Sequence, residues 1–567
     1  MLRILKRIGY VLGILTILIL LGSLILTMVV ELPNPSVPDL SPTRLEKERI
    51  SDEYFSIGRN WLKKSRQGLY ELYVEGEPFE RGVITGKLTR ELIHQQEEYF
   101  IGQIRELIPS DIYLRFLKYF ISWFNRKLDK YIGMEYLLEI YGISLSASDD
   151  FNYIAKPYQR ILNYHAAHDI GHALQDFRLV GCTSFALWDS KSEDSTLIHG
   201  RNFDFYMGDD FAKNKIISFI RPDSGFNFMI VTWGGMIGAV SGMNDQGLSI
   251  TINAAKSSVP TVAKTPITLL TREILQYAGT IEEAFEIAGN REIFVSESIM
   301  VSSAKDNQTA IIEKTPEEYV LYGSDTNFIV CTNHFQSDYF ISDTVNRQNI
   351  QESSSLYRLL RVKELLKRNK TVSVQGMVNI LRDRKGMEDR DIGLGNEKAI
   401  NQLIAHHSIV FKPKEKQFWI STNPYQLGEY ISYDLDDIFG DNSSTCTNMI
   451  QYDTMLTIPA DTFLTSIQYQ DFLLFNKLHK QITEIIDAGG KGSWSRNNSA
   501  LFIQSNREYY LVYDLLGDLH YSRKEFSEAK KYYDLALTKE VTSVKEENEI
   551  REKLNRCHTK LKKQKNS

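Results

Sequence analysis

The spacing of apolar and polar positions divides the chain into regions with different predicted structure. Between about residues 45 and 180 the pattern is mixed, with a short strand predicted at 70–74 and a helix at 83–107. From 182 to about 425, short apolar runs bounded by turn residues predict strands, with helices between them. After about residue 460 the pattern is helical. Runs of strands separated by helices are typical of a layered α+β domain.

The predicted strands of the middle region are 216–221, 228–233, 239–243, 248–253, 298–302, 309–314, 318–322, 328–331, 408–411 and 417–422. Its predicted helices are 266–278, 280–288, 354–367 and 374–383. A helical pair is predicted near the C-terminus, between residues 509 and 537, with apolar and small residues at the positions of one tetratricopeptide-type repeat. These positions are Tyr513, Leu516, Gly517, Ala529, Tyr533 and Ala536.

The N-terminal pattern predicts a membrane anchor at residues 1–30. Arg3, Lys6 and Arg7 precede an uncharged apolar run from residue 8 to 30, which is long enough to cross a bilayer. The run lacks the small-residue cleavage site of a secretory signal, and a buried core helix would not be apolar on all sides. The basic residues should stay in the cytoplasm. The rest of the chain, starting with a proline-rich linker at 31–45, is therefore expected outside it, in a periplasm or on a cell surface.

Composition narrows the classes of partner and cofactor. A net charge of -6 argues against nucleic acid, because nucleic-acid-binding proteins carry a basic surface. The four cysteines are widely scattered, which argues against a metal knuckle or a dense disulfide framework. We therefore expect no cofactor and no metal.

One cluster of histidines could nevertheless form a metal site. His165, His168 and His172 share one face of a predicted helix, and three histidines could bind zinc. The H-E-x-x-H arrangement is absent, however, and Gly171 weakens the helix. We favour structural or substrate-lining histidines over a metal site.

The candidate chemistry lies in a predicted hairpin that begins at Cys182. An apolar strand at 183–188, a polar turn at 189–195 and a second strand at 197–205 place Cys182 at one end, near Arg201 and Asp204. A cysteine nucleophile needs a base or a lowered pKa. Either a distant histidine, His334 or His406, forms a Cys-His pair, or cleavage before Cys182 frees an α-amine that serves as the base. A buried structural cysteine is the third possibility.

Several motifs, taken in order, resemble those of N-terminal-nucleophile (Ntn) hydrolases. The segments 181–185 and 200–204 are similar to the nucleophile region of the peptidase C45 group, which includes isopenicillin N acyltransferase. Choloylglycine hydrolases and penicillin V acylases are more distantly similar. Further segments that resemble this group are 76–82, 241–248, 251–253, 330–335, 353–358 and 407–411. The resemblance covers roughly residues 70–425 and implies an αββα sandwich.

The resemblance also implies residue roles. Cys182 would be the nucleophile, and the Gly181–Cys182 bond would be the autocleavage site. Asp204 would hold the freed amine and Arg201 would orient the thiol, although these two could instead form a surface ion pair. Asn253 and Asn333 would serve the oxyanion site, unless they are turn residues. Arg358 would be the late arginine of the family, and Arg361 is the alternative for that role.

The resemblance implies a division of labour along the chain. Residues 46–181 would be a pro-segment that stays bound as a small subunit, and residues 182–459 would be the catalytic domain. The tetratricopeptide-like region, 460–567, could bind a protein partner. The implied substrate is a small acylated amide whose acyl group passes from Cys182 to water or to an amine. A papain-like Cys-His hydrolase and a non-catalytic scaffold remain the alternatives.

Overall fold

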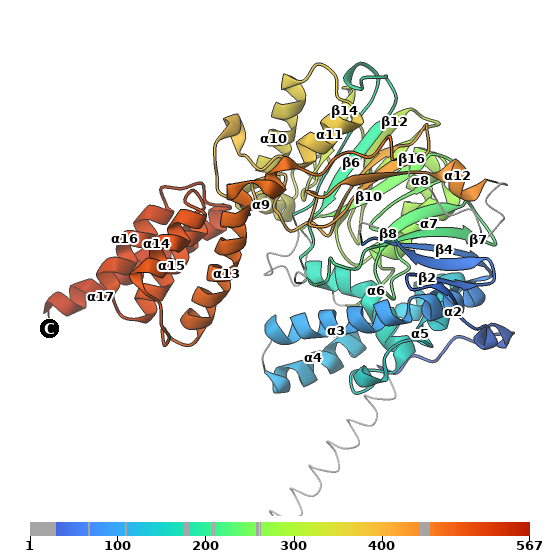
Figure 1. Cartoon of the computed structure of the whole chain (residues 1–567), viewed down its shortest axis with the longest axis horizontal. Coiled ribbons are helices and arrows are strands. Elements are labelled where there is room, and N and C mark those ends of the chain that lie inside the picture. The colour runs from blue at the N-terminus through green and yellow to red at the C-terminus, as the bar shows by residue number, and fades with distance from the viewer. Residues whose placement is uncertain are drawn as a thin grey trace, which may run out of the picture.

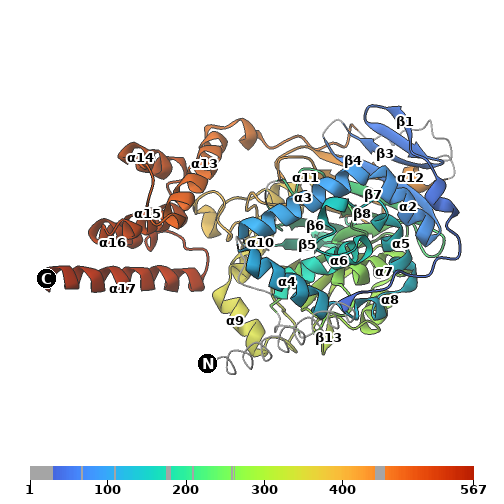
Figure 2. The same cartoon turned by 90° about the horizontal axis from the view of Figure 1, so that it is seen from below.

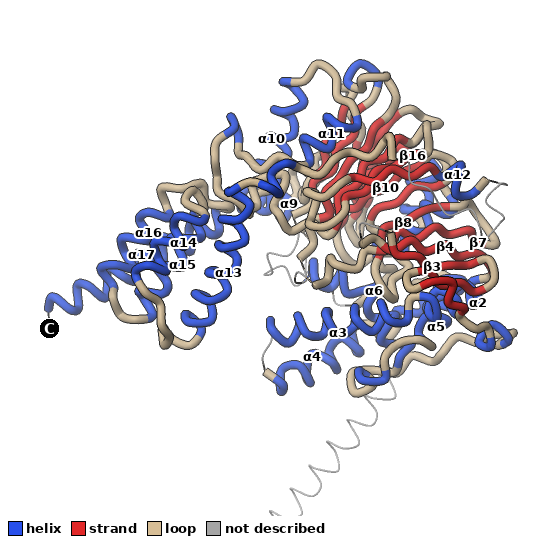
Figure 3. Tube along the Cα trace, viewed as in Figure 1, coloured by secondary structure: helices blue, strands red, loops and turns tan. Residues whose placement is uncertain are grey.

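The computed structural model describes residues 30–65, 68–107, 110–173, 181–206, 208, 210–256, 260, 262–440 and 454–566. Two β-sheets lie face to face at its centre, and helices cover them (Figures 1 and 3). The central strands of both sheets are buried at every position because they are covered on both faces, whereas residues 48–51 at one edge of the larger sheet are exposed.

The larger sheet has eleven strands in the order β1-β2-β3-β4-β7-β8-β9-β10-β11-β12-β13. Neighbouring strands are antiparallel except β4 and β7, which are parallel with Tyr70 opposite Ile216 and Gly76 opposite Pro222. This pair joins the segment before Cys182 to the segment after it. The strands are β1 Glu48–Ser51, β2 Tyr54–Ile57, β3 Asn60–Lys64, β4 Tyr70–Gly76, β7 Ile216–Pro222, β8 Phe228–Thr232, β9 Ser241–Asn244, β10 Leu248–Ala254, β11 Glu297–Ser303, β12 Gln308–Lys314 and β13 Tyr319–Tyr322.

The smaller sheet has six strands in the order β14-β5-β6-β15-β16-β17. Its strands are β14 Phe328–Cys331, β5 Thr183–Leu187, β6 Ile198–Phe203, β15 His407–Lys412, β16 Gln417–Ser421 and β17 Tyr430–Asp434. Helices α7 (Ile267–Tyr277) and α8 (Ile281–Gly289) pack on the larger sheet, while α10 (Ser355–Arg368) and α11 (Val374–Leu381) pack on the smaller one. The order is helix, sheet, sheet, helix, as the family resemblance implies.

The segment before Cys182 adds helices beside the larger sheet (Figure 2). These are α2 Pro78–Leu88, α3 Arg90–Leu107, α4 Asp111–Phe124, α5 Met134–Ser144 and α6 Pro157–Ala173. The single helix predicted at 83–107 is wrong in its bounds: helix α2 ends at Leu88, where Thr89 leaves helical geometry and bonds Thr85 through its hydroxyl.

A buried ion cluster fastens this segment to the rest of the molecule. Glu139 on α5 pairs with Arg81 on α2 at 2.7 Å and with Arg272 on α7 at 2.8 Å. All three side chains are buried, and the two guanidiniums hold the pKa of Glu139 below its ordinary value against the effect of burial. Losing one member of such a cluster leaves an uncompensated buried charge.

The C-terminal helices project from one side of the sandwich (Figure 1). They are α13 Ile467–Asp487, α14 Arg496–Ser505, α15 Tyr510–Ser522, α16 Phe526–Ala536 and α17 Val544–Asn566. The six positions predicted for the repeat-like pair are all buried, and Gly517 on α15 permits close contact with the Tyr533 ring on α16. Asn506 bonds both backbone groups of Leu394, which attaches these helices to the sandwich.

The membrane segment predicted at 8–30 lies outside the described residues, apart from Val30. Among the helices of the described ranges, none is both long enough and apolar enough to span a bilayer.

Candidate active site

Cys182 lies immediately before β5, buried between the two sheets with 1% of its surface exposed. Its Sγ accepts a hydrogen bond from Nη2 of Arg201 at 3.4 Å. A longer contact of 3.9 Å joins Sγ to the backbone oxygen of Asp204. Burial raises the pKa of the Cys182 thiol, and the Arg201 guanidinium opposes that rise.

Arg201 crosses from the smaller sheet to the larger one. It lies on β6, yet its guanidinium donates to the carbonyls of Val240 and Ile252 and to the hydroxyl of Ser241 at 2.9 Å. The side chain is fully buried and stacks over the Phe203 ring at 4.5 Å. These contacts fix one N–H toward the thiol and show that Arg201 is no part of a surface ion pair.

The carbonyl oxygen of Gly181, on the bond predicted to be cleaved, has two side-chain donors. Nη1 of Arg358 lies 2.8 Å from it, and Nε2 of Gln402 lies 2.6 Å from it. Arg358 also donates to the Cys182 carbonyl at 2.6 Å and to the Thr183 hydroxyl at 3.0 Å. The bond before the thiol is therefore held by donors aimed at the oxygen where negative charge would develop during attack.

Arg361, the competing arginine, faces away from this corner. It pairs with Asp383 at 2.8 Å, Asp389 at 2.7 Å and Glu364 at 3.0 Å. Of the two arginines on α10, Arg358 is the one that contacts Gly181 and Cys182.

Asp204 is fully buried, and neither carboxylate oxygen has a hydrogen-bond partner within the described part of the chain. Burial raises its pKa to about 7, although Arg358 and Arg201 both lower it. Since buried carboxylates are normally hydrogen-bonded, a carboxylate in this state beside a thiol is a candidate functional group.

The two asparagines lie at the same end of the sheets. Asn253, on β10, accepts a bond from Ser184 at 2.8 Å and donates to the Cys331 carbonyl at 3.1 Å. Asn333, just after β14, accepts a bond from Arg358 at 2.9 Å and donates to the Ala254 carbonyl at 2.9 Å. Asn253 is a strand residue, so the alternative of a turn residue is wrong for it. Each of the two amide nitrogens donates one hydrogen bond in the intact chain.

Neither candidate histidine of a Cys-His pair contacts Cys182 among the described contacts. His334 bonds the hydroxyls of Ser355 at 2.7 Å and Thr332 at 3.2 Å. His406 bonds His407 at 3.0 Å. Burial lowers the pKa of both, that of His334 to about 4. From the separate histidine cluster, His165 bonds the Ile161 carbonyl and the Ile237 amide, while the side chains of His168 and His172 lie outside the described ones.

Gln402 is a site residue that no sequence pattern predicted. It lies in the loop just before β15 and outside the family-like segment 407–411, and 221 positions separate it from Gly181. The one trace of this contact in the sequence is the glycine at position 181. A Cβ there would lie 2.5 Å from the Gln402 amide, so the close approach of the two residues requires glycine.

One cavity lies near Cys182, and a larger one lies away from the predicted site residues. A narrow one of about 30 Å³ is lined by Phe205, Phe211 and Trp233 on one side. The two phenylalanines share a packed cluster with Cys182. The remaining lining residues are Gln96, Glu97, Phe100, Tyr164, Ala167, Gly234, Gly235 and Met236.

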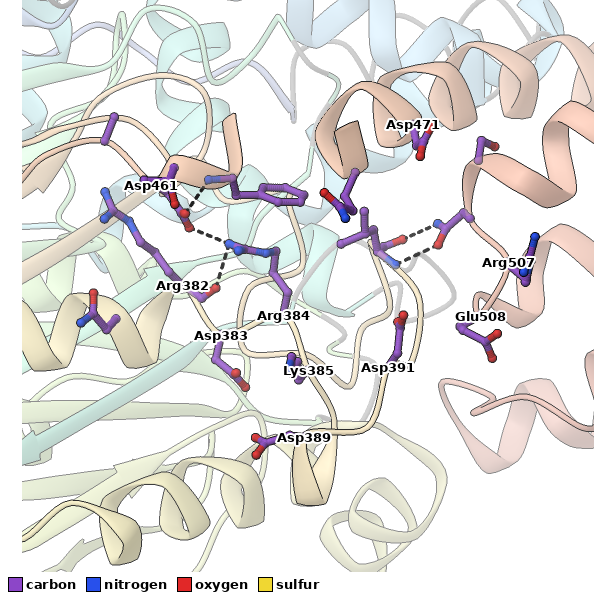
Figure 4. Close-up of a pocket in the computed structure, with 18 of the residues that line it drawn as sticks. Arg382, Asp383, Arg384, Lys385, Asp389, Asp391, Asp461, Asp471, Arg507 and Glu508 are labelled. Atoms are coloured by element: carbon purple, nitrogen blue, oxygen red, sulfur yellow. Dashed lines mark hydrogen bonds and ion pairs between the residues drawn. The ribbon is translucent and has the colours of Figure 1, made fainter. Parts of the chain in front are cut away.

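The larger cavity, about 1050 Å³, is a charged cleft between the sandwich and the C-terminal helices (Figure 4). Arg384 and Asp461 form an ion pair across one end of it, while Asp471 and Arg507 come from the helical side. None of the predicted site residues lines it.

Comparison with known proteins supports the class that this geometry indicates. Residues 190–424 match the family model described as acyl-coenzyme A:6-aminopenicillanic acid acyl-transferase. The family resemblance stated from the sequence is thereby confirmed for residues 190–424, which are similar to that acyltransferase family.

The curated relatives are distant. The N-acylethanolamine-hydrolyzing acid amidase of Caenorhabditis elegans is 25% identical over 266 residues, which is 43% of this chain and 66% of that protein. An uncharacterized protein of Archaeoglobus fulgidus is 24% identical over 279 residues, 46% of each chain. Protein dcd1B of Dictyostelium discoideum is 22% identical over 276 residues, 45% of this chain and 52% of that protein. The chain thus spans about half to two thirds of the relatives it matches.

Solved structures with similarity include the C. elegans amidase ortholog, at 18% identity and a TM-score of 0.30, covering 41% of this chain and 93% of that one. A variant of the conjugated bile acid hydrolase of Clostridium perfringens has 14% identity and a TM-score of 0.32, covering 45% and 93%.

Proposed function

We propose that this protein is an autoproteolytic cysteine amidase, in which Cys182 first cleaves its own chain and then hydrolyses a small acylated amide. The observation that carries the proposal is the environment of one peptide bond. The Gly181 carbonyl oxygen has donors from Arg358 and Gln402, and the thiol of the next residue is held by Arg201.

In the first stage, the Cys182 sulfur attacks the carbonyl carbon of Gly181. The oxygen becomes an oxyanion bonded by Arg358 and Gln402, which stabilise the developing charge. The C–N bond then breaks, the nitrogen takes a proton, and a thioester links the two residues. Water hydrolyses the thioester, which leaves a carboxylate on Gly181 and a free thiol and amine on Cys182.

Asp204 is the candidate acceptor for the thiol proton in that stage. Its carboxylate interacts electrostatically with Cys182 and has no hydrogen-bond partner in the described structure. After cleavage the new amine would bond Asp204 and act as the general base in the second stage. Asn253 and Asn333 would turn their amides toward the substrate oxyanion.

The segment before Cys182 would stay bound after cleavage. Strand β4 pairs along its whole length with β7, and Glu139 pairs with Arg272 across the two parts. Seven backbone pairs and a buried ion cluster connect the two pieces without the covalent bond. The proposed enzyme is therefore a complex of two fragments.

The proposed substrate is an amide with an apolar acyl group. The cavity near Cys182 has aromatic walls, and the C. elegans relative is named for hydrolysing N-acylethanolamines. At about 30 Å³ the cavity is too small for an acyl chain, so Phe211 and Trp233 would have to move to admit one. Acyl-coenzyme A, the acyl donor of a transferase reaction, is not expected outside the cytoplasm. We therefore favour hydrolysis, in which water accepts the acyl group from Cys182.

The deciding experiment is the intact mass and N-terminal sequence of the purified full chain. We expect two co-purifying fragments, the second beginning at Cys182, and an uncut chain for Cys182→Ala. Cys557→Ala, which removes another buried free thiol, should be cut normally. An uncut wild-type chain that hydrolyses amides would favour a Cys-His mechanism, and an uncut inactive chain would favour a scaffold.

Membrane attachment and a protein partner are further parts of the proposal. The apolar run at 8–30 supports a single-pass anchor with the catalytic domain outside the cytoplasm. Resistance of the full chain to carbonate extraction, and loss of that resistance on deleting residues 1–30, would bear this out. The charged cleft beside the C-terminal helices supports a partner there, and deleting 460–567 tests whether function depends on it.

A further inference from the structure

We propose that His407, acting through Ser241, is a positioning residue that fixes Arg201 on the Cys182 thiol. The inference rests on the proposed function, because it concerns the same nucleophile. Neither His407 nor Ser241 belongs to the residues assigned a role from the sequence.

The contacts form an unbroken chain of buried side chains. Nη2 of Arg201 lies 3.4 Å from Sγ of Cys182, and Nη1 of the same guanidinium lies 2.9 Å from Oγ of Ser241. That hydroxyl lies 2.8 Å from Nε2 of His407. All four side chains are at most 1% exposed, so water does not compete for these bonds.

The direction of the bonds follows from the one group that can only donate. Arg201 has no acceptor, so Ser241 must accept from it. The hydroxyl proton of Ser241 then needs an acceptor, and among the described contacts His407 Nε2 is the group that can accept it. His407 consequently carries its proton on Nδ1, which lies 3.0 Å from Nδ1 of His406.

The surroundings keep His407 neutral and therefore able to accept. Burial lowers its pKa well below the ordinary value, and His406, Arg201 and Lys215 add to the effect. A protonated imidazole would have no lone pair at Nε2 and would leave the Ser241 proton unsatisfied, which is costly in a buried site. The neutral ring thus orients Ser241, and Ser241 orients the guanidinium.

The hydrogen bonds from His407 through Ser241 to Arg201, called the relay below, lie where the two sheets meet. His407 begins β15 and Ser241 begins β9, so the bond between them joins the smaller sheet to the larger one. Arg201 follows the same path from β6. Another inter-sheet bond offers a control: Tyr433 on β17 donates to Glu71 on β4 at 2.8 Å, and no described contact joins it to Arg201.

The test is the rate of self-cleavage after cell-free synthesis of the full chain, followed by gel. We expect Ser241→Ala and His407→Phe each to slow cleavage about tenfold, the scale of one lost bond to a charged group. The double variant should be no slower than either single one, because both break the same chain. Ser241→Thr and His407→Gln, which keep the hydroxyl and an acceptor near the Nε2 position, should restore most of the rate.

Tyr433→Phe separates positioning from loss of stability. It removes one buried inter-sheet bond, so it should lower the unfolding midpoint as Ser241→Ala does while leaving the cleavage rate within about twofold. The relay would be overturned if the cleavage rate followed the unfolding midpoint in all variants. It would also be overturned if the losses of cleavage rate multiplied in the double variant. Normal cleavage by Ser241→Ala would overturn it as well.

Failure of the proposed function has a different signature. If the wild-type chain is not cut, alkylation of Cys182 by iodoacetamide, followed by peptide mass, replaces the cleavage assay. The relay then requires slower alkylation near neutral pH in Ser241→Ala than in Tyr433→Phe, because a loosened Arg201 stabilises the thiolate less. Equal rates in the two variants would refute it.

Discussion

The side-chain nitrogen of Gln402 lies 2.6 Å from the carbonyl oxygen of Gly181, on the peptide bond that precedes the nucleophile. Both residues are buried, and a Cβ at position 181 would lie 2.5 Å from that same nitrogen. Glycine is therefore what allows the donor to reach the bond.

We expect Gly181→Ala to slow self-cleavage by about a hundredfold, the scale of losing one oxyanion donor, because the methyl group displaces Gln402. Intact mass over time after synthesis measures the rate. Adding Gly181→Ala to Gln402→Ala should cost little more than Gln402→Ala alone. Gly102→Ala, where a Cβ meets open space, serves as the control. A normal rate for Gly181→Ala would show that Gln402 is dispensable.

The two arginines of α10 should behave differently on conversion to lysine. Arg358 bonds the Gly181 and Cys182 carbonyls and Asn333 with both ends of its guanidinium, which a lysine ammonium cannot span. We expect Arg358→Lys to reduce cleavage at least about a hundredfold. Arg361→Lys should leave the cleavage rate unchanged and lower the unfolding midpoint. The reverse outcome would transfer the family role to Arg361.

The hairpin around Cys182 could be predicted because its signals are local. Strands expected at 183–188 and 197–205 are found at Thr183–Leu187 and Ile198–Phe203, since two apolar runs on either side of a polar turn predict a hairpin. The ordered motifs likewise placed Arg201, Asp204 and Arg358 near the thiol.

Other features depend on contacts that a single sequence does not reveal. The parallel pairing of β4 with β7 joins residues about 150 positions apart, and no local pattern specifies such a partner. Gln402 and His407 acquire their positions only when the loop and strand near residue 405 fold back onto β6. Strand β17 at Tyr430–Asp434 was not predicted, because it lies beyond the strand pair at 408–411 and 417–422, where the strand pattern was expected to end.

Lys215 should be a source of instability near neutral pH. Its Nζ is buried without a hydrogen-bond partner in the described structure, and burial lowers its pKa to about 7. A lysine pKa depressed on folding destabilises the folded state below the unfolded pKa of about 10.4, most strongly below pH 7. We expect Lys215→Met to raise stability by about 1–3 kcal/mol at pH 7. In urea unfolding the gain should shrink as pH approaches 10, and a loss at pH 7 would mean that the ammonium has a partner.

Asp204 should give stability the opposite dependence on pH. Its pKa rises from 3.8 in the unfolded chain to about 7 in the folded one, so the folded state binds the extra proton between these values. Stability is then full below about pH 4 and falls as pH rises through 7. We compare Cys182→Ala, which stays uncut, with Cys182→Ala/Asp204→Asn by urea unfolding at pH 4.5 and 8.

We expect the chain that keeps Asp204 to lose up to about 3 kcal/mol relative to the chain with Asp204→Asn between these two pH values. An exposed carboxylate gives the control: Asp52→Asn, at a side chain that is 92% exposed, should not alter the pH dependence. Parallel curves for the two chains would mean that Arg201 and Arg358 keep Asp204 ionised throughout. In that case the low pKa of Asp204 would make it a weak acceptor of the thiol proton, and self-cleavage would favour another base.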